Sequence, residues 1–223
     1  MRAAIFDFDG VLVNSEPLHF RSLQASLLPE GIRITEPEYF TTYLAYDDRR
    51  AIRLAFEEHG IRLDLDRLDR IALRKAAIFE ELLPEVPFFP GARELARSLG
   101  RTMPVAIASG ALSGEIERIL EAGGIRDAFA AIVGADNVTR GKPDPEPYLE
   151  AMRRLRSSAP GLSPGTCLVF EDSVPGIASA LAAGMKVVAV ANSFPPAKLS
   201  AAHRVVSSLE GLADDGLQSL FPS

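Results

Sequence analysis

The sequence predicts an α/β fold: a doubly wound, mostly parallel sheet with an inserted all-helical segment. Short apolar runs alternate with helical patterns from Gly91 to the C-terminus, as in a chain built from βαβ units. The runs are apolar throughout, which is typical of strands covered on both faces. One further run, Ala3–Phe6, lies near the N-terminus and is separated from the others by a long helical stretch. This stretch is therefore expected to be an insertion between the first strand and the rest of the sheet.

The first strand and the start of the insertion are indicated by local signals. Ala3–Phe6 has the length of a buried strand, and a turn at Gly10 follows it. Ser15 is expected to cap a helix that places Phe20, Leu23 and Leu27 on one face. A capping box at Thr35 and Glu38 then predicts a second helix start.

Aspartates mark the later helices of the insertion. Asp47 or Asp48 is expected to start a helix that runs toward Glu58, and Asp66 one that reaches Leu83. No strand is expected between residues 14 and 85. The sequence thus predicts a helical cap domain at residues 15–85 and an α/β core domain at residues 1–14 and 86–223.

Strands and helices are expected to alternate after the prolines at positions 84, 87 and 90. The expected strands are Val105–Ala108, Ala131–Val133, Cys167–Phe170, Val187–Val190 and Arg204–Val206. The expected helices are Ala92–Leu99, Leu112–Ala122, Pro145–Leu155 and Pro175–Ala183. Asp144 is placed to cap the third of these helices, with Pro145 at its first position.

Composition limits the classes of partner. The chain has 223 residues, 47% of them apolar, and a net charge of −6, which argues against nucleic acid or an anionic membrane as its partner. Cys167 is the single cysteine, so no intramolecular disulfide can form. The N-terminus reaches Asp7 before a signal-like apolar region develops, and no run is long enough to span a bilayer. We therefore expect a cytoplasmic protein, with a monomer as the default and a homodimer left open.

Polar side chains follow several of the expected strands. Asp7 and Asp9 come after the first strand, Ser109 after the second, and Glu171 with Asp172 after Cys167–Phe170. Ligands of open α/β sheets bind at the carboxyl ends of the strands, so these side chains are expected to converge. Two adjacent carboxylates at such an end either raise the pKa of one of them or bind a cation, and a divalent metal would resolve the conflict.

Such a constellation suits phosphoryl transfer. Asp7 and Asp172, with a backbone carbonyl near Asp9, offer hard oxygen ligands for Mg²⁺. One carboxylate can attack phosphorus while a second protonates the leaving oxygen, and Asp7 and Asp9 divide these roles. Lys142 and Ser109, with amides near Gly110, would hold the phosphate oxygens.

Four ordered motifs resemble those of the haloacid dehalogenase-like superfamily. They are Phe-Asp-Phe-Asp-Gly-Val at residues 6–11, Ala-Ser-Gly at 108–110, Gly-Lys-Pro-Asp-Pro at 141–145, and Phe-Glu-Asp-Ser-Val-Pro-Gly-Ile at 170–177. The resemblance covers essentially the whole chain, and the helical insertion is similar to the cap of the β-phosphoglucomutase-like and phosphoglycolate-phosphatase-like subfamilies. It implies Mg²⁺ as cofactor and a small phosphorylated metabolite as substrate.

The resemblance also implies a role for each motif residue. Asp7 matches the nucleophile, Asp9 the general acid/base, Ser109 and Lys142 the phosphate ligands, and Asp172 a metal ligand. Glu171 matches a position that supports the metal site in some members. The second aspartate favours phosphoryl transfer over dehalogenation.

Three functions remain open at this point: a phosphatase, a β-phosphoglucomutase-like mutase, and a binding module without turnover. His19 and Lys75 match positions found in mutases and also in phosphatases. The cap loop around Tyr46 has an aspartate where mutases carry an arginine, with Arg49 and Arg50 adjacent. Residues 110–112 lack the further hydroxyl and lysine that mutases offer to phosphate. We favour a phosphatase, with the substrate-contacting candidates of the cap being His19, Tyr46, Arg49, Arg50 and Lys75.

Overall fold

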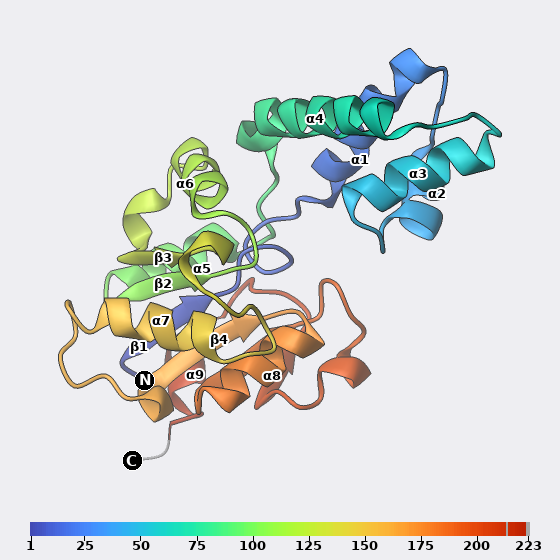
Figure 1. Cartoon of the computed structure of the whole chain (residues 1–223). Coiled ribbons are helices and arrows are strands. Elements are labelled where there is room, and N and C mark those ends of the chain that lie inside the picture. The colour runs from blue at the N-terminus through green and yellow to red at the C-terminus, as the bar shows by residue number, and fades with distance from the viewer. Residues whose placement is uncertain (213, 222–223) are drawn as a thin grey trace. The chain divides into compact units, whose positions relative to one another are not determined.

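The computed structural model describes residues 1–212 and 214–221. Within them, six strands form one parallel sheet in the order β3-β2-β1-β4-β5-β6 (Figure 1). The strands are β1 Ala3–Phe6, β2 Val105–Ala108, β3 Ala131–Val133, β4 Cys167–Glu171, β5 Lys186–Val190 and β6 Arg204–Val206. All six strands expected from the apolar runs are confirmed, with β4 and β5 each one residue longer. The N-terminal strand β1 lies in the middle of the sheet.

Helices cover both faces of the sheet, as the sequence predicts. They are α5 Ala92–Gly100, α6 Ser113–Ala122, α7 Glu146–Leu155, α8 Val174–Ala182 and α9 Asp214–Gln218. Helices α7 and α8 lie side by side on one face, over a core that includes Ala3 and Ile5. On the other face Phe6 meets Phe129 edge-on and stacks on Phe170 with ring centroids 4.5 Å apart.

The start of α7 differs in detail from the expected cap. Pro145 occupies the N-cap position and not the first helical position. Asp144 still serves the helix end, because its Oδ1 accepts the Glu146 N–H at 3.0 Å. Asp144 therefore lies one residue before the N-cap position, although its side chain still accepts a hydrogen bond from the first turn of α7.

The insertion consists of helices, as expected. Its helices are α1 Glu16–Leu27, α2 Glu36–Glu38, a π-helical turn Tyr39–Tyr43, α3 Asp48–Glu58 and α4 Leu65–Leu82. The capping box at Thr35 and the cap at Asp47 are confirmed. Two starts are corrected. Ser15 makes no side-chain cap, and Asp64 rather than Asp66 caps α4 by accepting the Arg67 N–H.

The described chain divides into two compact units. One comprises Met1–Asn14 and Pro87–Ser223, and the other Ser15–Val86. Apolar side chains of α1, α3 and α4 form a core of the second unit's own. Short 3-10 turns lie at Leu28–Glu30, Leu83–Glu85, Arg126–Ala128, Ala135–Asn137, Pro164–Thr166 and Pro196–Leu199. Among the described residues, no helix combines the length and apolar character needed to cross a membrane.

Candidate active site

The sheet brings three of the predicted strand ends together. In the register, Phe6 of β1 pairs with Ile107 of β2 on one side and with Phe170 of β4 on the other. The residues that follow these positions therefore emerge at the same edge. Asp7, Ser109 and Asp172 are all buried there.

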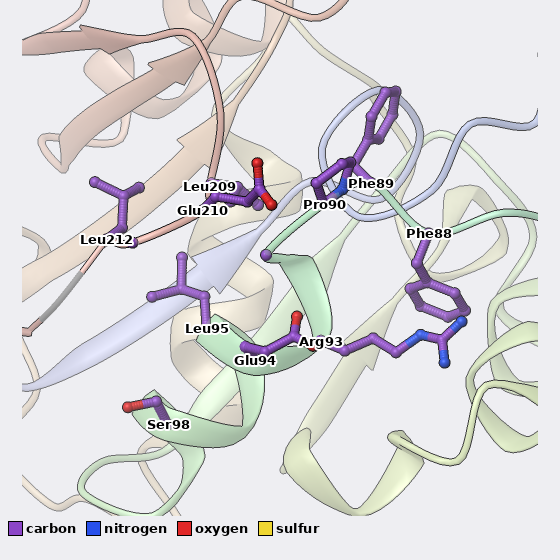
Figure 2. A pocket seen from close by; sticks show the side chains of 12 residues that line it. Phe88, Phe89, Pro90, Arg93, Glu94, Leu95, Ser98, Leu209, Glu210 and Leu212 are labelled. Carbon is purple, nitrogen blue, oxygen red and sulfur yellow. The ribbon is translucent and has the colours of Figure 1, made fainter.

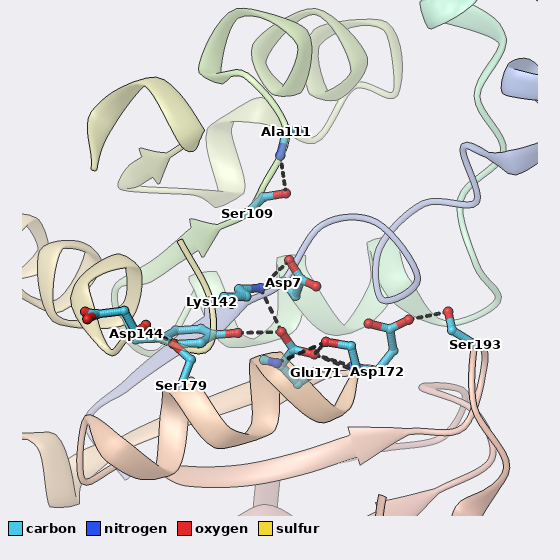
Figure 3. Close-up of polar contacts among 12 residues, drawn as sticks. Asp7, Ser109, Ala111, Lys142, Asp144, Glu171, Asp172, Ser179 and Ser193 are labelled. Atoms are coloured by element: carbon cyan, nitrogen blue, oxygen red, sulfur yellow. Dashed lines mark hydrogen bonds and ion pairs between the residues drawn. The ribbon is translucent and has the colours of Figure 1, made fainter. Parts of the chain in front are cut away.

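Lys142 joins two of the carboxylates. It comes from the loop before α7, and its Nζ lies 2.7 Å from Asp7 Oδ1 and 2.7 Å from Glu171 Oε1 (Figure 3). The ammonium also lies 5.0 Å from the centre of the Tyr148 ring. A single cation thus fixes the nucleophile candidate Asp7 to the end of β4.

Glu171 is held by hydrogen bonds on both of its oxygens. Oε1 accepts from Lys142 and from the Tyr148 hydroxyl at 2.9 Å. Oε2 accepts from the N–H groups of Asp172 and Ser173 at 2.8 Å each, and from the Ser173 hydroxyl. A Cβ on Gly176 would lie 1.6 Å from Oε1, so the carboxylate packs against α8 at a point where only glycine leaves room for it. These contacts suit a residue that holds Lys142. Direct support of a metal by Glu171 stays a prediction.

Asp172 is anchored by the loop that follows β5. Its Oδ2 accepts a short hydrogen bond from the Ser193 hydroxyl (Figure 3). Gly10, with φ of +79°, packs against the same carboxylate, and a Cβ there would lie 1.9 Å from Oδ2. Glycine is the residue that adopts this left-handed conformation without strain, and here it is also needed for space.

Burial and charge set the protonation of the cluster. Burial raises the pKa of Asp7 well above its usual value, although Lys142 opposes the shift. Burial likewise raises the pKa of Asp172 to about 6. Burial acts to lower the pKa of Lys142, but the carboxylates of Asp7 and Glu171 outweigh it and the pKa rises. Lys142 therefore stays charged. Its single positive charge is too small to neutralise the carboxylates around it.

The donor set fits a divalent cation. Among the described residues, Asp7, Glu171 and Asp172 form one group whose ligand oxygens lie within 4.8 Å of one another. Three buried carboxylates face one lysine, and an uncompensated buried charge is costly. Hard carboxylate oxygens at this spacing are the ligands that Mg²⁺ prefers. The residues present therefore fit a divalent metal ion.

The other predicted core residues lie around this group. Ser109 Oγ accepts the Ala111 N–H at 3.1 Å, in the turn that leads into α6. Gly110 is exposed, and apart from its two chain neighbours no described residue has an atom within 4 Å of where its Cβ would be. Asp9 lies in the loop after β1, and its side chain does not belong to the three-carboxylate group found among the described residues. The roles proposed for Ser109, Gly110 and Asp9 stay predictions.

Two of the predicted cap residues meet within their own unit. Lys75 is buried, and its Nζ lies 2.8 Å from Asp48 Oδ1 and 2.9 Å from His19 Nδ1. The His19 ring stacks on Phe79 at 4.3 Å. Burial, together with the Lys75 charge, lowers the pKa of His19 to about 4. Lys75 is thus a paired internal cation of the insertion.

The remaining cap candidates have partners on the surface of the same unit. Arg49 pairs with Asp69 at 2.6 Å, and the Arg50 guanidinium lies 5.7 Å from the centre of the exposed Tyr46 ring. Substrate contact by any of these residues stays a prediction.

Several contacts of the site were missed by sequence reasoning. Tyr148 and Ser173 bind Glu171, and Ser193 binds Asp172. Ser193 follows the end of β5 at the edge where the other site residues lie, so the strand-end rule could have identified it. Tyr148 lies within helix α7, and nothing in the surrounding sequence marks it as a site residue.

Pocket volume does not locate this site. A pocket of about 760 Å³ lies between residues 88–98 and 209–212 of the same unit (Figure 2). Phe88 and Leu95 line it, and Arg93 lies over the Phe88 ring at 4.4 Å. None of its lining residues belongs to the carboxylate group, so convergent chemistry and not cavity size identifies the candidate active site.

Comparison with known proteins agrees with this arrangement. Residues 4–190 match the family described as haloacid dehalogenase-like hydrolase. The chain is 32% identical over 187 residues to a phosphorylated carbohydrates phosphatase of Thermotoga maritima, covering 83% of each chain. It is 39% identical over 135 residues to the bifunctional riboflavin kinase/FMN phosphatase of Arabidopsis thaliana, covering 59% of this chain and 34% of that protein.

A solved structure extends the comparison to the whole fold. The crystal structure of a proposed β-phosphoglucomutase from Thermotoga maritima superposes with a TM-score of 0.80 at 29% identity, covering 98% of this chain and 99% of that one. The likeness includes the helical insertion as well as the sheet.

Proposed function

Because the chain belongs to the haloacid dehalogenase-like hydrolase family, we propose that it is a Mg²⁺-dependent phosphatase of small phosphorylated metabolites. The substrate would be a sugar phosphate or a similar phosphomonoester. The observation that carries the proposal is the buried group in which Lys142 lies 2.7 Å from the Asp7 carboxylate, beside Asp172 at the end of β4. A phosphate bound there would meet a nucleophile, a cation and a metal site at once.

Asp7 acts as the nucleophile in this mechanism. A carboxylate oxygen of Asp7 attacks phosphorus, and the bond from phosphorus to the substrate's alcohol oxygen breaks. Asp9 donates its proton to that oxygen, so the product leaves as a neutral alcohol and Asp7 carries an aspartyl-phosphate. Asp9, now ionised, takes a proton from water. The water oxygen attacks phosphorus, which releases phosphate and restores Asp7.

Charge on the phosphate oxygens is met by fixed groups. Lys142 neutralises part of it, and Glu171 keeps the ammonium in place through its contact at 2.7 Å. The Ser109 hydroxyl and the amide near Gly110 add hydrogen bonds to the equatorial oxygens. The backbone carbonyl of Asp9 with the carboxylates of Asp7 and Asp172 would hold Mg²⁺. The bound cation supplies charge neutralisation, which lets an anionic carboxylate approach an anionic phosphate.

Carbohydrate phosphates are favoured as substrates by similarity. The relative from Thermotoga maritima that matches along most of both chains is a phosphorylated carbohydrates phosphatase. The insertion supplies a second argument. A mutase must hold a bisphosphate intermediate with further cations, whereas the cap cation Lys75 is already paired with Asp48 at 2.8 Å. This pairing favours the phosphatase over the mutase.

The mutase remains the second candidate. It is supported by the likeness to the proposed β-phosphoglucomutase and by the presence of His19 beside Lys75. Measuring both products from β-glucose 1-phosphate, with its bisphosphate activator, separates the two functions. A phosphatase yields free phosphate and glucose. Rapid conversion to glucose 6-phosphate with little free phosphate would replace our proposal by the mutase.

A panel of phosphorylated metabolites tests the substrate class. We expect Mg²⁺-dependent phosphate release from one or more sugar phosphates. Absence of both phosphate release and isomerisation across the panel would leave the binding module as the remaining function.

A further inference from the structure

Two side chains of one loop contact Asp172, an expected metal ligand, and Gly10, which follows the expected ligand Asp9. The loop follows β5, and its residues Asn192 and Ser193 are here called the strap. Asn192 Nδ2 donates to the Gly10 carbonyl at 2.7 Å, and the Ser193 hydroxyl donates to Asp172 Oδ2. The strap thereby connects the loop after β1 with the end of β4.

The space around the strap is closely filled. A Cβ on Gly10 would lie 1.9 Å from Asp172 Oδ2 and 2.8 Å from Ser193 Oγ. The Gly10 N–H is also fixed, because it donates to the Val13 carbonyl at 2.8 Å. Both polar groups of Gly10 are therefore held, and the peptide that joins it to Asp9 has little freedom to rotate.

We propose that Asn192 and Ser193 are positioning residues that pre-organise the divalent-cation site. Ser193 holds one carboxylate oxygen of Asp172, which sets the direction of the other toward Asp7. The Gly10 N–H, held on the Val13 carbonyl, orients the Asp9 carbonyl of the same peptide, which is the expected backbone ligand, and Asn192 holds the following peptide through the Gly10 carbonyl. Neither side chain is expected to touch the reacting phosphate. The inference rests on the proposed function, since it assigns the strap to the metal of that site.

Loss of a residue that positions a metal ligand has a measurable effect on metal affinity. Groups that hydrogen-bond to metal ligands orient those ligands, and their loss typically weakens metal affinity by about 10- to 100-fold. A contact that only stabilises the loop would instead lower the stability of the metal-free protein and leave metal affinity unchanged. Metal affinity and stability therefore separate the two roles.

The test is calorimetric titration of Mg²⁺ into the metal-free full chain, without substrate. Ser193→Ala and Asn192→Ala are each expected to raise the Mg²⁺ dissociation constant about tenfold. Ser193→Thr keeps a hydroxyl and is expected to restore affinity close to wild type. Ser208→Ala is a matched control, because Ser208 follows β6 and its hydroxyl binds the Glu210 N–H instead of the site. Circular dichroism checks that each variant is folded.

Wild-type Mg²⁺ affinity in both alanine variants would overturn the proposal, as would equal weakening in Ser208→Ala. Failure of Ser193→Thr to restore affinity would also count against it. Since the titration does not depend on turnover, it is separable from the proposed function. If the alanine substitutions weaken Mg²⁺ binding and the wild-type protein nevertheless releases no phosphate, the phosphatase proposal fails while the positioning role of the strap stands.

Discussion

Lys142 lies between the carboxylates of Asp7 and Glu171, so its removal leaves buried negative charge without a partner. We predict that Lys142→Met lowers kcat at saturating Mg²⁺ by about 10²- to 10³-fold, the usual effect of losing one such charge-stabilising group. Breaking a buried pair should also cost about 3–5 kcal/mol of stability. Phosphate-release kinetics and urea unfolding measure the two effects.

A second substitution controls for the charge imbalance. Adding Glu171→Gln to Lys142→Met removes one unpaired carboxylate and should recover part of the stability without recovering activity. Recovery of activity in the double variant would mean that Lys142 is needed only to balance Glu171, and that it does not act on the phosphate.

Substitution of Gly176, which lies on α8, tests whether activity depends on the position of the Glu171 carboxylate. A Cβ at Gly176 would lie 1.6 Å from Glu171 Oε1, so Gly176→Ala must displace the carboxylate that holds Lys142. We predict a loss of kcat of about tenfold or more, since misplacement by about 1 Å can cost 10²-fold. Steady-state kinetics at saturating substrate and Mg²⁺ measure this loss.

Gly114→Ala is the matched control for this change. Gly114 lies in the first turn of α6, and beyond its chain neighbours and the backbone of its own helix no described atom is within 4 Å of where its Cβ would be. Alanine there should keep activity and raise helix stability by up to about 1 kcal/mol. Equal activity in the two alanine variants would contradict a role for the Glu171 position.

At the residue scale, the sequence predicted which strand ends meet, but it was not used to single out the residues that hold the carboxylates there. Asp7 and Asp172 follow apolar runs, so their meeting follows from the parallel sheet alone. Ser193 and Tyr148 are common residue types whose importance arises from which atoms they face in three dimensions. The strand pattern predicts which residues lie at the carboxyl edge of the sheet. Tertiary packing decides which other side chains contact them.

Helix α1 carries a group whose protonation opposes folding. The pKa of His19 is lowered from 6.5 to about 4 by burial and by Lys75. The unfolded chain binds this proton below about pH 6.5, while the folded chain binds it only near pH 4. His19 therefore contributes a stability that is present above pH 6.5 and is lost as the pH falls toward 4. The ceiling of the effect is about 3 kcal/mol.

The pH dependence of unfolding measures this contribution. Between pH 7 and 4, the free energy of unfolding of wild type should fall more steeply than that of His19→Gln, which has no titrating group at this position. Parallel curves for the two proteins would show that protonation of His19 does not oppose folding.

At the element scale, strands were easier to predict than helix starts. Each strand contains a short apolar run, so its place is visible in the sequence, although β4 and β5 each extend one charged residue beyond their run. Around the start of α4, Asp64 and Asp66 are both good caps, and the backbone selects Asp64 because its carboxylate reaches the Arg67 N–H. The π-helical turn Tyr39–Tyr43 has no sequence signal, since its aromatic and threonine residues suit several local structures.

For the whole molecule, the chain leaves and re-enters the first unit at two hydrogen-bonded points. The chain leaves the first unit at Asn14 and returns at Pro87, and the Asn14 N–H donates to the Pro87 carbonyl at 2.9 Å. Leu12 and Phe89 are joined by a second backbone hydrogen bond. The two chain segments at this boundary are thus joined to each other within the first unit, and one of them continues from the loop that carries Asp9 and Gly10.

The most direct test of the central claim is phosphate release by wild type and Asp7→Asn on the metabolite panel, each with Mg²⁺ and with EDTA. We predict release by wild type only with Mg²⁺, and a loss of about 10³-fold or more in Asp7→Asn because the amide is not a nucleophile. Circular dichroism of Asp7→Asn should remain native. Turnover by Asp7→Asn close to wild type, or turnover by wild type that EDTA does not reduce, would contradict a magnesium-dependent phosphatase acting through Asp7.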